Sequence, residues 1–281
     1  MKRIIFYLKK LIRSEHLSLS DKIRSLIRYF CNHIGLNNQR KVINWVSGLK
    51  YYYKKGDASF SDNYYFQISD YSESMFLIRY VDNSDLFLDV GANHGHYSLL
   101  LAGIKDVHCL AIEPVKLAYE NLFDNVKLNN LEELIELRNI GLGKVSGILY
   151  FSNDLGTMNK VVGREYEAKE EVQVKTIDSL NILPTIMKVD VEGFEFDVLN
   201  GGLETLKNPS LNVLICEIND TVKVDKSNID LFNLILSIGF RPYEYVNDIL
   251  YEIESYNKKG HNTIFVKDIN LVKNRKINVY K

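Results

Sequence analysis

Cysteine is scarce in this chain, and its spacing excludes two common kinds of cross-link. The 281 residues include three cysteines, Cys31, Cys109 and Cys216, which are far apart and odd in number. Neither a disulfide framework nor a Cys-x-x-Cys zinc site is indicated, and a reducing compartment such as the cytoplasm fits best. The chain also lacks a large excess of positive or of negative charge. Because the formal net charge is −1, the composition implies no attraction to nucleic acid.

Long apolar runs are also absent, and none approaches the ~20 residues that span a bilayer. The amino terminus, MKRIIFYLKKLIRSEH, begins like a signal peptide, but Lys9 and Lys10 interrupt the apolar run and no small-residue cleavage site follows. There is no internal repeat and no low-complexity tract. We expect a cytoplasmic protein with one large domain and an appendage.

The first 65 residues differ in character from the rest. Apolar residues recur at helical spacing between basic ones, which predicts a short basic amphipathic helix; they are Ile4, Ile5, Leu8, Leu11 and Ile12. Two interpretations of this helix remain. It packs on the domain or on a second copy of the chain, or residues 1–14 make weak peripheral contact with acidic lipid at the inner membrane face. The stretch LKYYYKKGDASFSDNYYF holds five tyrosines and is interpreted as a loop, either a linker or a substrate-facing lip.

From residue 66 onward, strand signals alternate with helix signals. The helical patterns are 95–104, 115–130, 194–207 and 227–238, and the strand-like runs are 85–90, 107–113, 134–140, 185–191 and 211–219. An inserted hairpin is expected from 148–152 and 171–177, and an antiparallel pair from 240–246 and 262–267. This order predicts a doubly wound, Rossmann-like α/β sheet that is mostly parallel, with an antiparallel strand in its C-terminal hairpin. The expected domains are a helical, tyrosine-rich extension, 1–65, and an α/β domain, 66–281.

A glycine turn separates the first strand from the first helix in LFLDVGANHGHYSLLLA, residues 86–102. Gly91 lets the backbone turn sharply, Ala92 and Asn93 follow it, and Gly95 allows a close approach to the helix start. The helix amino terminus suits a carboxylate, while Asp89 can accept hydrogen bonds from an ammonium group. The turn is therefore suited to an amino-acid zwitterion.

The second strand ends at Glu113, which can accept hydrogen bonds from two ribose hydroxyls. Asn139, near the end of the third strand, is a candidate contact for adenine. Ribose together with an amino acid points to S-adenosylmethionine as cofactor. The dinucleotide fingerprint G-x-G-x-x-G is not met. The one Tyr-x-x-x-Lys pair, Tyr51 and Lys55, lies upstream of the turn and argues against hydride chemistry.

Several motifs together resemble the FkbM-type S-adenosylmethionine-dependent methyltransferases: DVGANHGHYSLLLA, AIEP, NLFDNVKLNN, IMKVDVEGFEFDVLNGG and LICEIN. They cover roughly residues 70–268 in the family's order, and KVDVEGFE is the specific part. The resemblance implies a class I methyltransferase fold and, usually, O-methylation of hydroxyls on sugars or secondary metabolites.

Transfer of a methyl group to a hydroxyl needs a general base or a metal ion, because an alcohol is a poor nucleophile until it loses its proton. The candidate catalytic residues, at the carboxyl edge of the sheet, are Asp190, Glu192, Glu217 and His261. A structural alternative for Glu192 is that it only favours a helix amino terminus, together with Glu195. His94, His96 and His108 lack metal-ligand spacing, so we expect no dedicated metal.

The leading hypothesis is an S-adenosylmethionine-dependent O-methyltransferase for a hydroxyl on a sugar, glycan precursor or secondary metabolite. Residues 1–65 would shape the access of this small-molecule or glycan acceptor. Two alternatives remain open: an NAD-dependent oxidoreductase or epimerase on the same sheet, and a catalytically inactive methyltransferase-like scaffold. No nucleic-acid partner is expected, and a homo-oligomer is compatible with the sequence.

Overall fold

The computed structural model describes residues 2–34, 39–56, 60–155, 159–218, 228–256 and 262–280. The chain divides into two compact units, residues 1–69 and 70–281, whereas we expected the division after residue 65. No helix within the described ranges is both long and apolar enough to cross a membrane.

The first unit combines helices with a small hairpin. Its elements are α1 (Lys2–Arg13), α2 (Leu19–Ile34), β1 (Lys41–Asn44), the 3-10 turn η1 (Val46–Gly48), β2 (Lys50–Tyr53) and α3 (Ser61–Phe66). The predicted amino-terminal helix is thereby confirmed as α1. Tyr7 of α1 stacks on Tyr29 of α2 with ring centroids 4.0 Å apart, and its hydroxyl hydrogen-bonds to Ser25 at 2.7 Å. Buried aromatic rings are therefore the main contact between the first two helices.

The tyrosine-rich segment forms regular structure, so the interpretation as a loop is wrong. Tyr51 and Tyr53 alternate with Tyr52 along β2 and are buried, as expected for one face of a strand. Tyr51 stacks on Phe60 and Tyr53 on Tyr64, each at 4.4 Å between ring centroids. Aromatic residues suit a half-buried strand. These rings pack on one another inside the first unit.

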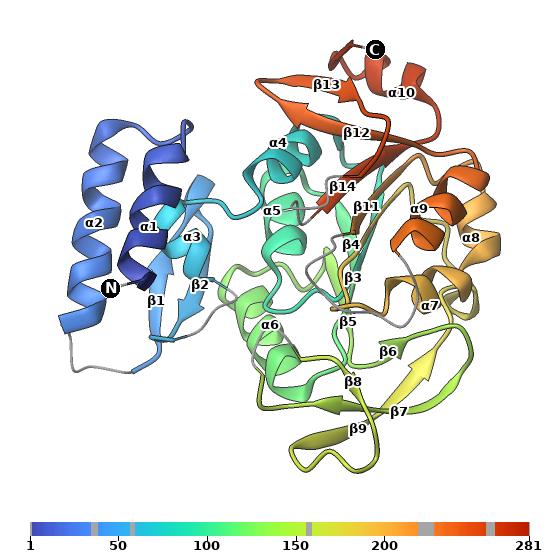
Figure 1. The fold of residues 1–281 in the computed structure, drawn as a ribbon, viewed down its shortest axis with the longest axis horizontal. Coiled ribbons are helices and arrows are strands. Elements are labelled where there is room, and N and C mark those ends of the chain that lie inside the picture. The colour runs from blue at the N-terminus through green and yellow to red at the C-terminus, as the bar shows by residue number, and fades with distance from the viewer. Residues whose placement is uncertain are drawn as a thin grey trace. The chain divides into compact units, whose positions relative to one another are not determined.

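The second unit is built on a nine-stranded sheet in the order β15-β13-β12-β14-β11-β10-β3-β4-β5 (Figure 1). The strands are β3 (Leu86–Val90), β4 (His108–Ile112), β5 (Ile135–Arg138), β10 (Ile186–Val189), β11 (Val213–Glu217), β12 (Arg241–Val246), β13 (Ile249–Glu252), β14 (Asn262–Val266) and β15 (Asn278–Tyr280). From β5 to β11 the strands are parallel, and β14 is antiparallel to both β11 and β12. The predicted doubly wound sheet with an antiparallel C-terminal strand is confirmed.

Helices cover both faces of this sheet (Figure 1). They are α4 (Tyr71–Tyr80), α5 (His96–Lys105), α6 (Lys116–Leu128), α7 (Glu195–Asn200), α8 (Leu203–Lys207), α9 (Asn228–Ser237) and α10 (Ile269–Asn274). One face packs on α7, α8 and α9 through a large apolar cluster that includes Val189, Leu199, Leu206 and Phe232. The other face carries α4 and α5. The strands are buried on both sides, which explains their nearly continuous apolar runs.

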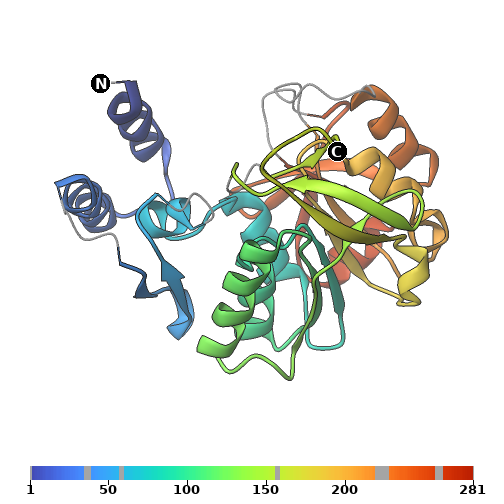
Figure 2. The same cartoon turned by 90° about the horizontal axis from the view of Figure 1, so that it is seen from below.

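A separate four-stranded sheet, in the order β6-β9-β7-β8, is inserted between β5 and β10. Its strands are β6 (Gly141–Leu142), β7 (Gly147–Ser152), β8 (Val161–Val162) and β9 (Lys169–Lys175), and a 3-10 turn, η3 (Asp178–Leu180), follows. β7 and β9 are antiparallel, as the predicted inserted hairpin requires. Figure 2 shows this sheet, in yellow-green, as a layer distinct from the large one.

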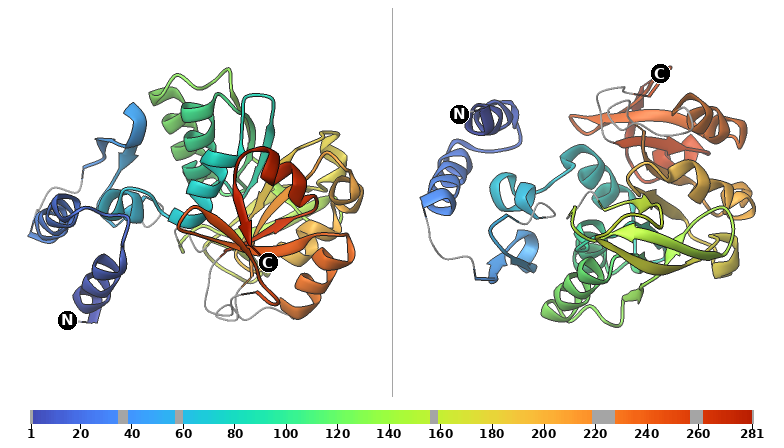
Figure 3. Two further views of the ribbon diagram at one scale, coloured as in Figure 1. Left: turned by 90° about the horizontal axis from the view of Figure 1, so that it is seen from above. Right: turned by 60° about the horizontal axis from the view of Figure 1, so that its bottom comes forward.

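The C-terminal edge of the large sheet is longer than predicted. β12 and β13 are joined by Asn247 and Asp248, both at positive φ (49° and 66°), with Val246 paired to Ile249. A type I′ two-residue hairpin loop has positive φ at both central positions, and Asn and Asp tolerate it. Beyond this hairpin, α10 and β15 complete the edge (Figure 3).

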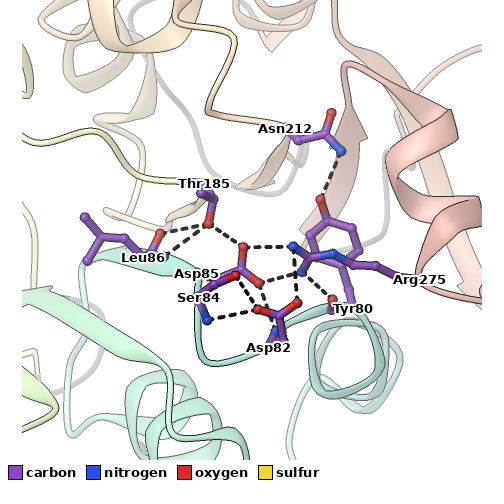
Figure 4. A network of polar contacts seen from close by, with 8 residues as sticks. All are labelled: Tyr80, Asp82, Ser84, Asp85, Leu86, Thr185, Asn212 and Arg275. Atoms are coloured by element: carbon purple, nitrogen blue, oxygen red, sulfur yellow. Dashed lines mark hydrogen bonds and ion pairs between the residues drawn. The ribbon is translucent and has the colours of Figure 1, made fainter.

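A buried polar network ties this edge to the start of the first strand (Figure 4). The Arg275 guanidinium donates to both carboxylate oxygens of Asp85, with Nη2 to Oδ1 at 3.1 Å, and lies 4.4 Å from the Tyr80 ring centroid. Thr185 Oγ1 donates to Asp85 at 2.8 Å, and Asn212 donates to the Tyr80 hydroxyl at 3.0 Å. Because Asp85 is only 3% exposed, its charge depends on these partners.

The substitution Arg275→Met should lower the free energy of unfolding by about 2–4 kcal/mol, because it leaves the buried Asp85 carboxylate without its cation. Urea denaturation followed by circular dichroism measures the change. The control is Arg79→Met, since Arg79 pairs with Asp248 where both side chains are about half exposed. That substitution should cost less than about 1 kcal/mol. Equal stability of the two variants would contradict the role assigned to Arg275.

Candidate functional site

The glycine turn lies against the end of a neighbouring strand. Gly91 has φ +78°, and a Cβ there would lie 1.9 Å from the backbone oxygen of Asp190. The expected sharp turn is present. However, the atom that closely approaches Gly91 belongs to the loop after β10. Gly91 therefore sets the distance between the turn and the Asp190 loop.

Glu113 organises the turn from the adjacent strand. Its Oε2 accepts the backbone N–H of Asn93 and its Oε1 that of Val115, both at 2.9 Å, while Ile112 O accepts the amides of Gly91 and Ala92. Asn93 has φ +50°, so this hydrogen bond holds a left-handed conformation. Burial raises the pKa of Glu113 to about 7, although the two amide donors lower it. Each carboxylate oxygen keeps a lone pair for a further donor.

Gly95 starts α5 at φ +96°, and a Cβ there would lie 2.5 Å from Leu122 Cδ1 of α6. The close approach is therefore between two helices. Since the N-cap residue is glycine, it offers no side-chain oxygen to the first-turn amides of α5. These free N–H groups lie at the edge of the sheet where the parallel strands end. They are therefore available to a ligand carboxylate, as expected for the amino terminus of a helix.

Asp89 lies in β3 beneath α5 and is 1% exposed. Its Oδ2 accepts the Ser98 hydroxyl at 2.6 Å, whereas its Oδ1 is buried and has no hydrogen-bond partner among the described residues. Lys188 is paired with Asp89 in the register of β10 and β3. Burial raises the pKa of Asp89, and Lys188 and Ser98 oppose the shift. Of the two carboxylate oxygens of Asp89, the predicted acceptor for an ammonium group, Oδ2 is therefore hydrogen-bonded and Oδ1 has no donor among the described residues.

Lys188 carries a buried ammonium group, 4% exposed as a residue. It donates to Asp190 Oδ2 at 3.0 Å and lies 5.1 Å from the Tyr97 ring centroid. Burial lowers the pKa of Lys188, but Asp190 and Asp89 together raise it above its ordinary value. Asp190 is therefore committed to an ion pair with Lys188.

The loop after β10 holds a strained residue. Glu192 has φ +52°, and Gly193 follows at φ +94°. Glu195, 5% exposed, stabilises this turn because its Oε1 accepts the amides of Val191 and Gly193 at 3.0 and 3.1 Å. A left-handed non-glycine residue costs about 1–2 kcal/mol and persists where the surroundings enforce it. Glu195 thus positions Glu192, in addition to beginning α7.

Three carboxylates from two strands converge beside this loop. Oxygens of Asp190, Glu192 and Glu217 lie within 4.8 Å of one another, and all three side chains are partly buried. Burial, followed by the charges of Asp190 and Glu217, raises the pKa of Glu192 to about 7. A carboxylate with a near-neutral pKa suits proton abstraction, and oxygens this close would also suit a divalent cation.

A cavity of about 200 Å³ opens beyond β11. Its lining includes Glu73 of α4, Tyr243 and Tyr245 of β12, and Asn262 of β14. Asn262 is the register partner of Glu217, and its Oδ1 is buried and, within the part of the chain that the structure describes, has no hydrogen-bond partner. The cavity therefore adjoins the end of β11, where Glu217 lies.

The remaining predicted residues take other places. Asn139 is exposed, and its side-chain amide donates to the backbone oxygens of Glu113 and Pro114 at 2.8 and 2.9 Å, which fixes the start of the β4–α6 loop. His261 lies outside the described residues. His96 Nε2 hydrogen-bonds to Ser74 of α4 at 2.9 Å, and the His94 backbone oxygen accepts from Asn125.

Sequence reasoning did not assign Glu195 to the turn. Glu195 follows Gly193 by two residues, so its side chain could reach back to the turn, a spacing that resembles a capping box. The antiparallel strand predicted at 262–267 places its first residue, Asn262, at the carboxyl edge of the sheet, and the antiparallel pairing of β14 with β11 confirms that position.

A doubly wound sheet with a glycine turn after β3, an acid after β4 and acids at the ends of β10 and β11 defines a ligand-binding α/β protein of the nucleotide-cofactor type. The family model "Methyltransferase FkbM domain" matches residues 89–258. The chain belongs to this family. The resemblance stated from the motifs is thereby confirmed.

Solved structures similar to the chain include methyltransferase FkbM from Methylobacillus flagellatus KT, at 18% identity and a TM-score of 0.47 over 66% of this chain and 44% of that one. TYW2 from P. horikoshii in complex with MeSAdo matches at 13% identity and a TM-score of 0.46, and the match covers 83% of this chain and 73% of the TYW2 chain. The chain thus spans less than half of the Methylobacillus chain. No curated protein sequence matches at a significant level.

The substitution Gly91→Ala should destabilise the protein by about 3 kcal/mol or more, because the new methyl group meets the Asp190 carbonyl as well as an unfavourable φ. The matched control is Gly239→Ala. Gly239 also has positive φ, +102°, but nothing lies within 4 Å of a Cβ there. Its cost should stay near 1–2 kcal/mol. Thermal unfolding measures both, and equal losses would show that the close approach at Gly91 is unimportant.

Proposed function

We propose that this protein is an S-adenosylmethionine-dependent methyltransferase acting on a hydroxyl group of a sugar, glycan precursor or related small molecule. The proposal rests mainly on the order of features along the carboxyl edge of the sheet. The glycine turn and Glu113 follow β3 and β4, the acids follow β10 and β11, and the cavity lies by β12 and β14. The proton-accepting groups therefore lie between a cofactor region and an acceptor region.

The residues around the turn suit the proposed cofactor. Glu113 retains lone pairs for the two ribose hydroxyls, and the start of α5 offers its amides to the carboxylate. The buried Oδ1 of Asp89 lacks a donor, which an ammonium group would supply. Bound there, S-adenosylmethionine would supply an electrophilic methyl group.

Glu192 is the best candidate for the proton acceptor. Asp190 is bound to Lys188 and Glu195 to two loop amides, whereas no hydrogen bond joins the Glu192 side chain to any described residue. Its raised pKa, about 7, matches a base that works near neutral pH. Asp190 and Glu217 favour removal of the proton indirectly, because their negative charges raise that pKa. We propose that Glu192 takes the hydroxyl proton as the nucleophilic oxygen attacks.

The cavity favours a small polar acceptor. Its lining includes Glu73 and Asn262, whose side chains can form hydrogen bonds with hydroxyl groups, together with residues of β12 such as Tyr243 and Tyr245. The Asn262 Oδ1 would gain the partner that it lacks.

The oxidoreductase alternative is weaker. The strand order of dinucleotide-binding sheets has no antiparallel strand inserted before the last one, whereas here β14 lies between β11 and β12. Binding of NAD in place of S-adenosylhomocysteine would nevertheless establish it, and binding of neither would favour the scaffold.

Calorimetric titration with S-adenosylhomocysteine should give micromolar binding that weakens as the pH falls below about 7, by roughly tenfold per unit well below that value. Ribose hydroxyls need the ionised form of Glu113, and its pKa of about 7 makes that form prevail only above pH 7. Glu113→Gln should bind more weakly at pH 8 and lose the pH dependence. An unchanged pH profile in the variant would remove Glu113 from the ribose site.

Glu192→Gln should lower turnover by about 100-fold or more and change the S-adenosylhomocysteine dissociation constant by less than about threefold. The assay follows S-adenosylhomocysteine release with acceptors found in a screen of sugars and nucleotide sugars. Glu204→Gln, at an exposed position on α8, is the control and should be fully active.

The same assay with EDTA separates a general base from a metal ion. We expect activity to persist in EDTA. Loss of activity that Mg²⁺ restores would instead mean that Asp190, Glu192 and Glu217 act through a bound cation.

A further inference from the structure

The two units carry opposite charge. Residues 1–69 contain thirteen lysines and arginines and four acidic residues. Residues 70–281 contain twenty-two lysines and arginines and thirty-two acidic residues. The formal charges are therefore +9 and −10, which the overall value of −1 conceals. A unit of this size with such an excess is attracted to polyanionic surfaces.

The first unit also exposes apolar side chains in an ordered way on α2. Leu19, Ile23, Ile27 and Phe30 recur every three or four residues and are between 49% and 77% exposed. Residues with this spacing form one stripe along a helix. Ser25 and Tyr29, buried against α1, lie on a different face of the same helix. α2 is therefore apolar on its outer side although its inner side is already packed.

The outer side of α1 has a similar character. Ile5, Leu8 and Ile12 are exposed at spacings of three and four, and Phe6 is 71% exposed. Among the residues of α1 whose side chains the structure describes, Tyr7 and Leu11 are buried in the core of the unit, and Ile4 is partly buried. Lys9 and Arg13 are exposed beside these apolar residues. Intramolecular packing thus accounts for one side of the predicted amphipathic helix and leaves the other exposed.

We propose that the outer faces of α1 and α2 bind the surface of an anionic lipid bilayer. Helices that bind in the interface place apolar side chains at the level of the acyl chains and basic ones among the head groups. A second copy of the chain is a poorer occupant, because its contact through the same face would bring two units of charge +9 together. A nucleic acid would leave the stripe of α2 in water. The proposal is independent of methyl transfer in the second unit.

The test is co-sedimentation of the full chain with two kinds of vesicle, phosphatidylcholine alone and phosphatidylcholine with about one-third phosphatidylglycerol. We expect binding to the anionic vesicles only, weakened when NaCl rises from about 50 mM to about 500 mM. The double variant Ile23→Gln, Ile27→Gln should weaken binding by roughly tenfold or more, because both side chains leave the lipid. Lys9→Gln with Arg13→Gln should weaken it and reduce the salt dependence.

The control is the double variant Ile148→Gln, Leu183→Gln, which removes side chains of similar exposure, 59% and 62%, from the second unit. It should bind as the unchanged protein does. Circular dichroism and the fluorescence of Trp45, the single tryptophan, verify that the variants fold. Absence of vesicle binding, or equal binding to both kinds of vesicle, would overturn the proposal. So would self-association that the Ile23 and Ile27 variant abolishes in sedimentation velocity.

Discussion

The buried ammonium of Lys188 determines which side chains can meet at the carboxyl edge of the large sheet. An uncompensated charge in such a place costs several kcal/mol, so the neighbouring chain must supply anions within reach. Asp89 from β3 and Asp190 from the end of β10 do so. The ion pair holds Asp190 at the strand tip, where its carbonyl oxygen closely approaches Gly91. One cation therefore connects the glycine turn with the loop that carries the acids.

The acidic side chains at this edge fall into two groups: those that form hydrogen bonds or ion pairs within the protein, and those that remain available to react with a substrate. Asp190 is bound to the lysine, Glu113 to two amides on either side of it, and Glu195 to the amides around a strained residue. The strained backbone of Glu192 is thus supported by a buried neighbour, and its side chain lies beside Asp190 and Glu217 without a hydrogen-bond partner among the described residues. Rigid support of a reactive group by a second layer of hydrogen bonds is the general condition for precise positioning.

The sheet was largely predictable because parallel strands buried on both faces read as continuous apolar runs, and the family motifs are local. Why particular residues occupy their positions was harder to predict from the sequence. Gly91 and Asp190 are far apart in sequence, so only the fold reveals their contact. The tyrosines of β2 alternate in burial, but three identical residues show no alternation of polarity. The Asn247–Asp248 turn between apolar residues was a usable signal for the missed hairpin. The place of Asn262 beside the end of β11 followed from the predicted antiparallel strand, whereas its pairing with Glu217 in particular depends on a register that only the fold reveals.

The bridge between Arg275 and Asp85 joins residues 190 positions apart in the chain. Asp85 immediately precedes β3, a central strand of the sheet, while Arg275 follows the last helix. On a ribosome, the first strand would therefore emerge long before the cation that neutralises its neighbouring carboxylate. The second unit therefore cannot complete its native contacts until Arg275 has been synthesised. Until then, a nascent chain carries an unfinished sheet with its apolar faces open to chaperones.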